Sequence, residues 1–162
     1  MEKRKHPRLK DYDYSQNGAY FITVCVEKRR PILSTVVGRG DHTPPQVELT
    51  ACGKVLDKYI RGIEGAYKSV SVDKYVIMPN HFHLLISIAA PDNAHGGVWS
   101  PRPTVQTVLR SLKTMVTKEI GRPIFQTSFY DHIIRDENDY LTRWQYIDDN
   151  PARWAEDEYY AK

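Results

Sequence analysis

The apolar residues of the chain recur with two different periods, which predict four strands and three helices. Short segments rich in β-branched and aromatic side chains are typical of strands, and they cover residues 19–26, 70–78, 81–88 and 125–134. Apolar residues spaced three and four positions apart are typical of helices, and they cover residues 48–63, 104–121 and 136–150. Only Pro79 and Asn80 separate the second strand from the third, so these two strands are expected to form a hairpin. The Gly- and Pro-rich segment 36–46 is expected to be a loop.

The order of these elements is β-α-β-β-α-β, followed by one C-terminal helix. This order predicts an α+β protein with a ferredoxin-like, predominantly antiparallel sheet. The chain shows no internal repeat and no linker-like segment, so residues 1–162 are expected to form a single domain. That domain would carry a basic N-terminal arm at 1–10 and an acidic C-terminal tail at 152–162.

Composition narrows the class of protein. Hydrophobic residues make up 41% and charged residues 27% of the chain, as in ordinary globular proteins. No apolar run is long enough for a membrane helix, and the basic N-terminus lacks the apolar core of a secretory signal. Two cysteines, Cys25 and Cys52, are too few for a disulfide framework, which indicates a reducing cytoplasm.

Charge is unevenly distributed along the chain, although the net charge is only +3. Residues 1–10 and residues 101–122 each carry a net charge of +4, whereas residues 131–162 carry nine acidic residues against four basic ones, or −5. This pattern is compatible with a surface that binds a polyanion. It is equally compatible with ordinary solvated surface charge, and charge alone does not decide between them.

Two histidines begin the third predicted strand. Because side chains alternate along a strand, His81 and His83 point to one face and Phe82 to the other. Phe82 begins an apolar row that continues through every second residue to Ile88, and this row is expected to pack under two helices. Two imidazoles in this spacing can bind one cation on the opposite face. A pair of ordinary surface or core histidines remains an alternative at this point.

The last predicted helix has an apolar stripe and a separate polar row. At 100° per residue the stripe comprises Tyr140, Leu141, Trp144 and Ile147. The polar row is expected on roughly the opposite side and comprises Asp139, Arg143, Tyr146 and Asn150. An aromatic ring on a polar face, one turn before an amide, is either a functional group or a plain surface tyrosine.

Three blocks of sequence together resemble the REP-associated tyrosine transposases, a branch of the single-tyrosine HUH transposases. The segment from Met78 to Ile86 resembles the motif of two histidines around a bulky residue, and residues 131–136 and 146–151 resemble two further blocks. The resemblance covers nearly the whole chain and implies a ferredoxin-like fold. It also implies that His81, His83 and Asn150 bind a divalent metal. Insertion-sequence relatives often carry Gln at the position of Asn150.

The implied activity is metal-dependent cleavage and strand transfer of single-stranded DNA. Tyr146 would form a covalent phosphotyrosine intermediate, with His81 and His83 completing the catalytic set. The metal would be Mg²⁺ or Mn²⁺, the DNA partner a single strand or a hairpin such as a REP sequence, and the protein a monomer or homodimer. Phosphate contacts would come from the basic segments, namely from Lys3, Arg4, Lys5, Arg8, Arg110, Lys113 and Lys118.

Other activities fit the same residues. A relaxase-like nuclease on this fold would share the two histidines but would differ in what becomes of the DNA. A DNA-binding regulator that has lost catalysis would need neither the histidines nor Tyr146. A structural zinc protein is disfavoured because no cysteine accompanies the histidine pair.

Overall fold

A four-stranded antiparallel sheet forms the centre of the protein, for which a computed structural model describes residues 18–38, 44–89 and 103–159. The strands lie in the order β4-β5-β1-β6, and every neighbouring pair is antiparallel. Their bounds are Gly18–Cys25 for β1, Val70–Ile77 for β4, His81–Ile88 for β5 and Tyr130–Ile133 for β6. The α+β class and the antiparallel sheet predicted from sequence are therefore confirmed, as is the β4–β5 hairpin.

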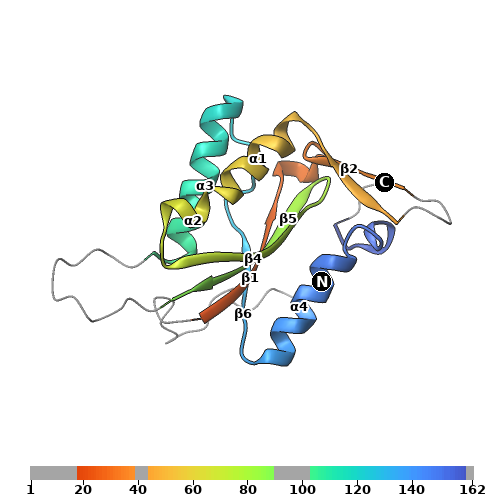
Figure 1. The fold of residues 1–162 in the computed structure, drawn as a ribbon. Coiled ribbons are helices and arrows are strands. Elements are labelled where there is room, and N and C mark those ends of the chain that lie inside the picture. Colours follow the sequence, from red (N-terminus) through yellow and green to blue (C-terminus); the bar gives the residue numbers. More distant parts are fainter. Residues whose placement is uncertain (1–17, 39–43, 90–102, 160–162) are drawn as a thin grey trace.

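Helices cover both faces of this sheet (Figure 1). On one face lie α1 (Ala51–Arg61), the short α2 (Ile63–Ala66) and α3 (Val105–Ile120), and on the other lies α4 (Glu137–Asp149). Two of the three predicted helix starts are confirmed, because Thr104 caps α3 and Asp136 caps α4 through their side chains. The helix predicted from residue 48 begins at Ala51 instead, because Gln46–Leu49 form a strand. Gly121 ends α3 in the left-handed conformation, at a φ of 90°. Two single-turn 3₁₀ helices complete the description, η1 at Glu27–Arg29 and η2 at Trp154–Glu156.

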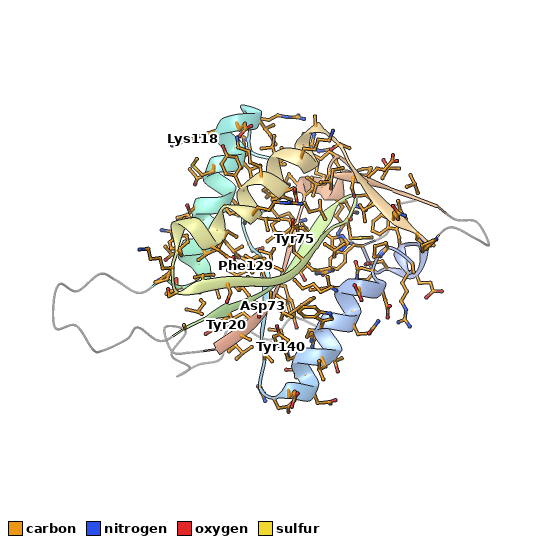
Figure 2. The ribbon with its side chains drawn as sticks, viewed as in Figure 1. Tyr20, Asp73, Tyr75, Lys118, Phe129 and Tyr140 are labelled. Atoms are coloured by element: carbon orange, nitrogen blue, oxygen red, sulfur yellow. The ribbon has the colours of Figure 1, made fainter. Side chains whose placement is uncertain are left out.

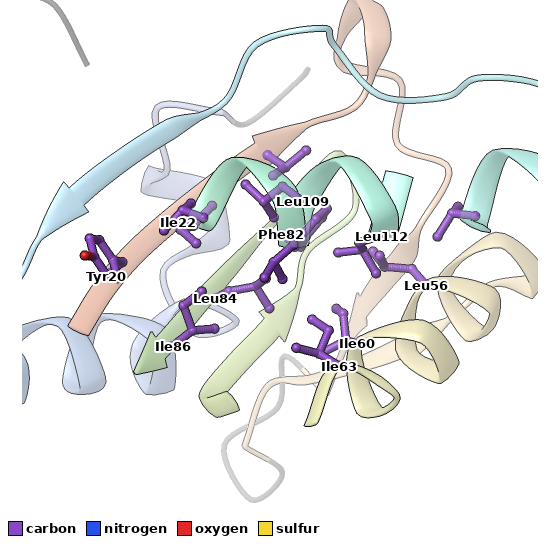
Figure 3. Close-up of a cluster of buried hydrophobic side chains, with 14 of the residues drawn as sticks. Tyr20, Ile22, Leu56, Ile60, Ile63, Phe82, Leu84, Ile86, Leu109 and Leu112 are labelled. Atoms are coloured by element: carbon purple, nitrogen blue, oxygen red, sulfur yellow. The ribbon is translucent and has the colours of Figure 1, made fainter. Parts of the chain in front are cut away.

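The main hydrophobic core lies between the sheet and the layer of α1 and α3 (Figure 3). Phe82, Leu84 and Ile86 are fully buried there, as the alternation in β5 predicts. They pack with apolar side chains of α1 and α3, among them Leu56 and Leu109. This core leaves the other face of β5, which carries His81 and His83, to be covered by α4 and the C-terminal segment.

The segment 36–46, expected to be a loop, contains parts of two strands instead. β2 (Ser34–Val37) pairs with β3 (Gln46–Leu49) in a separate two-stranded sheet, with Val36 opposite Val47. Both valines pack against a cluster that contains Trp154 and Tyr159, more than 100 residues away in sequence. Local composition gives no sign of this long-range contact. The Gly and Pro residues of the segment therefore predict a loop where the structure has strand residues.

The predicted strand at 125–134 is also shorter in the structure. Phe125 makes only an isolated bridge to Val26, and the regular strand β6 begins at Tyr130. Between them, the Lys113 ammonium group donates to the carbonyl oxygens of Gln126 and Thr127, at 2.8 Å and 3.2 Å. The Lys113 side chain therefore provides hydrogen bonds to backbone carbonyl groups that would have paired with a neighbouring strand if β6 were longer.

The structure contains no helix, within the described residues, with the length and apolar character needed to cross a membrane. Cys25 and Cys52 are both free thiols.

Candidate functional site

His81 and His83 lie side by side on the sheet face opposite the main core, with their Nε2 atoms 3.1 Å apart. Both side chains are buried, although the sequence placed them on a face available to a ligand. The α4 helix and residues 154–159 cover this face, and neither covering contact can be predicted from the period of β5. Two neighbouring imidazole nitrogens in a buried position can hold one cation between them.

Hydrogen bonds to the other ring nitrogens fix the orientation of the two imidazoles. The Asn80 amide nitrogen donates to the carbonyl oxygens of Tyr159 and Arg29, at 2.6 Å and 3.3 Å, so its oxygen faces His81. That oxygen lies 2.8 Å from His81 Nδ1 and can only accept, so Nδ1 carries the proton and Nε2 presents a lone pair. The Thr23 hydroxyl lies 2.8 Å from His83 Nδ1 and can donate or accept. Outer partners of this kind orient metal-binding histidines in proteins.

Burial keeps both imidazoles neutral. It lowers the pKa of His81 to about 3, helped by the positive charge of Arg29, while the nearby Asn150 amide opposes the shift. Burial also places the pKa of His83 well below its ordinary value, and the neighbouring His81 and Arg143 act in the same direction. Neutral imidazole is the form that binds metals, so the pair is prepared for a cation at neutral pH.

The α4 helix brings Tyr146 and Asn150 to the histidines. The Tyr146 ring meets His83 edge-on, with ring centroids 5.3 Å apart, and it remains 37% exposed. Asn150 lies one turn later and is buried; its Nδ2 donates to the Tyr146 carbonyl at 3.2 Å. Its oxygen Oδ1 accepts no hydrogen bond from the described residues. An unsatisfied buried amide oxygen beside two imidazole nitrogens fits the donor set of a divalent cation.

This donor set depends on the amide. Among the described residues, no three His, Cys, Asp or Glu side chains form a group that could hold a metal ion. A donor set with three protein ligands at the histidine pair would therefore have to include the Asn150 oxygen.

The polar row of α4 does not lie opposite the apolar stripe, contrary to the expectation from sequence. At 100° per residue the two rows are separated by only about a third of a turn. Ile147 of the apolar stripe and Asn150 of the polar row are both buried, whereas Leu141 is 55% exposed. The helix thus contacts the sheet through side chains of both rows, which places the buried Ile147 and the candidate site residue Asn150 on one surface.

Burial raises the pKa of the Tyr146 hydroxyl, and the negative charge of Asp157 raises it further. A hydrogen-bonding interaction with Asn150 and the positive charge of Arg143 act in the opposite direction. The hydroxyl is therefore protonated at neutral pH in this state, and it needs additional positive charge nearby to become a nucleophile.

The C-terminal segment covers the histidine pair from outside. The Tyr159 ring packs on His81 with centroids 4.5 Å apart, and the Trp154 ring lies 6.0 Å from the same imidazole. An Asp157 carboxylate oxygen is 3.8 Å from His81 Nε2. Tyr159 belongs to the segment expected to be an acidic C-terminal tail, and its ring is closer to His81 than any other tyrosine ring recorded among the described residues. The contact between Tyr159 and His81 forms because the chain turns back toward the sheet after α4.

The cations expected to contact DNA are not gathered around the histidines. Arg110, Lys113 and Lys118 belong to α3, in the layer across the sheet from α4, and Figure 2 shows Lys118 far from the α4 residue Tyr140. Burial lowers the pKa of Lys113, whose ammonium group binds backbone carbonyls. Lys3, Arg4, Lys5 and Arg8 lie outside the described residues.

Three cations that were not among those candidates lie on the site face instead. Arg143 stands over the Phe21 ring at 5.2 Å, and Arg29 over the Tyr159 ring at 5.3 Å. Lys74 pairs with Asp148 of α4 at 2.6 Å. Arg143 was visible on the polar row of α4, but Arg29 becomes a neighbour of the site only through the fold.

Comparison with known proteins identifies relatives along almost the whole chain, although no family model matches it. An uncharacterized protein of Haemophilus influenzae is 30% identical over 176 aligned residues, which cover 99% of this chain and 94% of that protein. The REP-associated tyrosine transposase of Escherichia coli K12 is 25% identical over 141 residues, which cover 86% of this chain and 70% of that protein.

The fold agrees with this relationship. The structure of a REP-associated tyrosine transposase bound to a REP hairpin matches with a TM-score of 0.62 at 21% identity, covering 90% of this chain and 73% of that one. Sequence similarity and a shared fold thus lead to the same relatives. The chain is a homologue of the REP-associated tyrosine transposases.

Proposed function

We propose that the protein cleaves and rejoins single-stranded DNA through a covalent bond to Tyr146, in a reaction that depends on a divalent metal. The observation that carries this proposal is the meeting of Tyr146 with His83 at 5.3 Å, beside an unsatisfied Asn150 oxygen. Homology to the REP-associated tyrosine transposases supports the same activity. Hairpin or REP-like DNA is the proposed substrate, because the homologous structure was obtained bound to a REP hairpin.

Each residue has a defined task in this proposal. His81, His83 and Asn150 would hold Mg²⁺ or Mn²⁺, which when bound supplies positive charge for the phosphate and for the phenolate of Tyr146. The Tyr146 oxygen attacks the phosphorus atom, and its proton leaves to solvent. The bond from phosphorus to one deoxyribose oxygen breaks, and that oxygen takes up a proton to become a free hydroxyl. Reversal of the step by a second strand's hydroxyl restores a phosphodiester and the tyrosine.

The DNA strand must reach a face that residues 154–159 now cover. Tyr159 packs on His81, and the Asn80 amide holds the backbone of Tyr159 with a hydrogen bond of 2.6 Å. We infer that this C-terminal segment withdraws before DNA enters. It is held by ring contacts, by hydrogen bonds and by the cluster in which Trp154 and Tyr159 pack against Val36 and Val47, so a local opening that breaks these contacts suffices.

Several further features belong to the same proposal. The strand order β4-β5-β1-β6 supports assignment to the ferredoxin-like split βαβ arrangement. The free thiols of Cys25 and Cys52 support action in a reducing cytoplasm. The α3 cations and the N-terminal basic residues remain predicted phosphate contacts, and a monomer or homodimer remains the predicted state.

The proposal is tested by incubating labelled hairpin DNA with the protein and Mn²⁺, and scoring the covalent adduct and the rejoined product. Wild-type protein should form both, and Tyr146→Phe should form neither while it still binds DNA. Tyr140→Phe and Tyr159→Phe are matched controls, because each removes one tyrosine hydroxyl from the same face. An adduct mapped to any tyrosine other than Tyr146 would refute the mechanism.

A catalytically silent DNA-binding regulator is the second candidate. The observation in its favour is the burial of His81 under Tyr159, which closes the metal-binding face in this state. This candidate predicts hairpin binding without adduct under every metal condition. A relaxase-like nuclease that does not transfer the strand, in contrast, would form the adduct but no rejoined product.

A further inference from the structure

A cavity of about 390 Å³ opens beside Tyr146 and is lined by His83. Phe21 and His83 form a stacked aromatic wall, with ring centroids 5.1 Å apart. Arg143 contributes the cation of this lining, and Glu158 contributes its carboxylate. Because Glu158 belongs to the C-terminal segment, withdrawal of that segment would leave a cavity with a positive charge and aromatic walls.

The Arg143 guanidinium group is held from one side. Its Nε atom lies 3.5 Å from Asp139 Oδ1, and its centre stands 5.2 Å from the Phe21 ring. The other Asp139 oxygen is held in turn by His132 Nε2 at 2.8 Å and by the backbone amide of Arg135 at 3.3 Å. Asp139 therefore anchors the Nε side, and the terminal nitrogens of Arg143 have no partner recorded among the described residues.

We propose that Arg143 binds the phosphate of the nucleotide attacked by Tyr146, and that Asp139 and His132 position its guanidinium group. This inference rests on the proposed function and adds a substrate contact to it. Arg143 precedes Tyr146 by three residues, so both side chains lie on one face of α4 and line the same cavity.

The chemistry of the cavity favours an oxyanion over a neutral ligand. A planar guanidinium group presents two terminal nitrogens to two oxygens of one anion, and the proposed substrate makes that anion a phosphate. Phe21 and His83 stack on each other and are almost fully buried, so they close one side of the cavity without offering a free ring face to a base. The lining thus supports a phosphate contact through Arg143.

Both the candidate metal-binding side chains and Arg143 lie near Tyr146. The donor set of His81, His83 and Asn150 adjoins the Tyr146 ring, and Arg143 shares the cavity with the same ring. A phosphate placed against the Tyr146 oxygen would then meet positive charge from Arg143 and from a divalent metal held by the donor set. Such charge stabilises the additional negative charge that develops when a phosphodiester is attacked.

The test uses hairpin DNA with a short single-stranded extension, in which one linkage at a time is replaced by a neutral methylphosphonate. Binding is measured by fluorescence anisotropy in buffer with EDTA, with Tyr146→Phe as the parent protein so that no adduct forms. With Arg143 intact, one linkage should lose about tenfold in affinity when neutralised, as expected for a charge-assisted pair. In the Arg143→Gln variant of this parent, neutralisation of that same linkage should have no effect.

Matched variants separate this contact from a general loss of charge or of structure. Arg122→Gln removes the same charge from an exposed position after α3 and should retain the tenfold loss at that linkage. Arg143→Lys should retain part of it, which keeps the test decisive if Arg143→Gln is destabilised. Asp139→Asn should reduce the loss at that linkage alone, whereas a purely structural role would weaken binding to every DNA equally.

The inference would be overturned if neutralising each linkage lowered the affinity equally in the parent protein and in its Arg143→Gln variant, because the side chain would then be coupled to no phosphate. This outcome is independent of the adduct assay on the wild-type protein. Normal adduct formation without coupling contradicts the phosphate contact of Arg143 alone. Specific coupling without any adduct contradicts the proposed strand transfer and leaves the nucleotide site in place.

Discussion

Lowering the pH from 7 to 5 is expected to destabilise the metal-free protein, because the histidine pair is neutral in the folded state. The pKa of His81 falls from an ordinary value of 6.5 to about 3 on burial, and that of His83 is also lowered. The unfolded chain therefore binds protons below pH 6.5 that the folded chain does not bind. The stability contributed by neutral His81 is fully present above pH 6.5, and it is lost progressively as the pH falls toward 3.

The size of the effect follows from the linkage between protonation and folding. Each pH unit below 6.5 removes about 1.4 kcal/mol per histidine that stays neutral when folded. At pH 5 the loss from His81 is about 2 kcal/mol, and His83 adds a loss of the same sign. Burial raises the pKa of Asp157, so this carboxyl takes up a proton more readily in the folded state and offsets a part of the loss.

Urea denaturation in the presence of EDTA measures this loss directly. For a slope of about 2 kcal/mol per molar urea, a change of about 2 kcal/mol moves the midpoint by about 1 M. His81→Gln keeps a hydrogen-bonding side chain but cannot titrate. The free energy of unfolding that is lost between pH 7 and pH 5 should therefore be smaller in this variant than in the wild type, by about 2 kcal/mol. An identical pH dependence in both proteins would show that His81 is not buried as a neutral group.

Three further changes test other parts of the structure. Gly121→Ala should lower the free energy of unfolding by about 1 kcal/mol, because residue 121 has a φ of 90°; an unchanged thermal midpoint would contradict the left-handed cap. Tyr140→Phe removes a hydrogen bond of 2.8 Å to Asp73, at a cost of about 1 kcal/mol, and should speed hydrogen exchange in α4 relative to α1. Tyr159→Ala removes the ring that covers His81 and should increase adduct formation with Mn²⁺; a slower reaction would show that this ring assists DNA binding instead.

Local sequence patterns determined the elements that need no distant partner to be recognised. Alternation along β5 assigned Phe82 to the core and His83 to the other face, because the two-residue period of a strand is a property of the backbone itself. Thr104 and Asp136 marked the starts of α3 and α4, because capping depends on residues within one turn. The motif blocks likewise indicated the relatives that sequence and fold comparison then identified.

Only the tertiary structure decided which side chains surround the histidines. Tyr159 covers His81, and Arg29 stands over Tyr159, through contacts that span 78 and 130 positions of the chain. The β2–β3 hairpin depends in the same way on packing against Trp154. Such contacts form because burying apolar rings away from water is favourable wherever the fold brings them together. The local spacing of residues in the sequence does not predict which rings will be brought together. The burial that sets the pKa of His81 is therefore a property of the assembled fold.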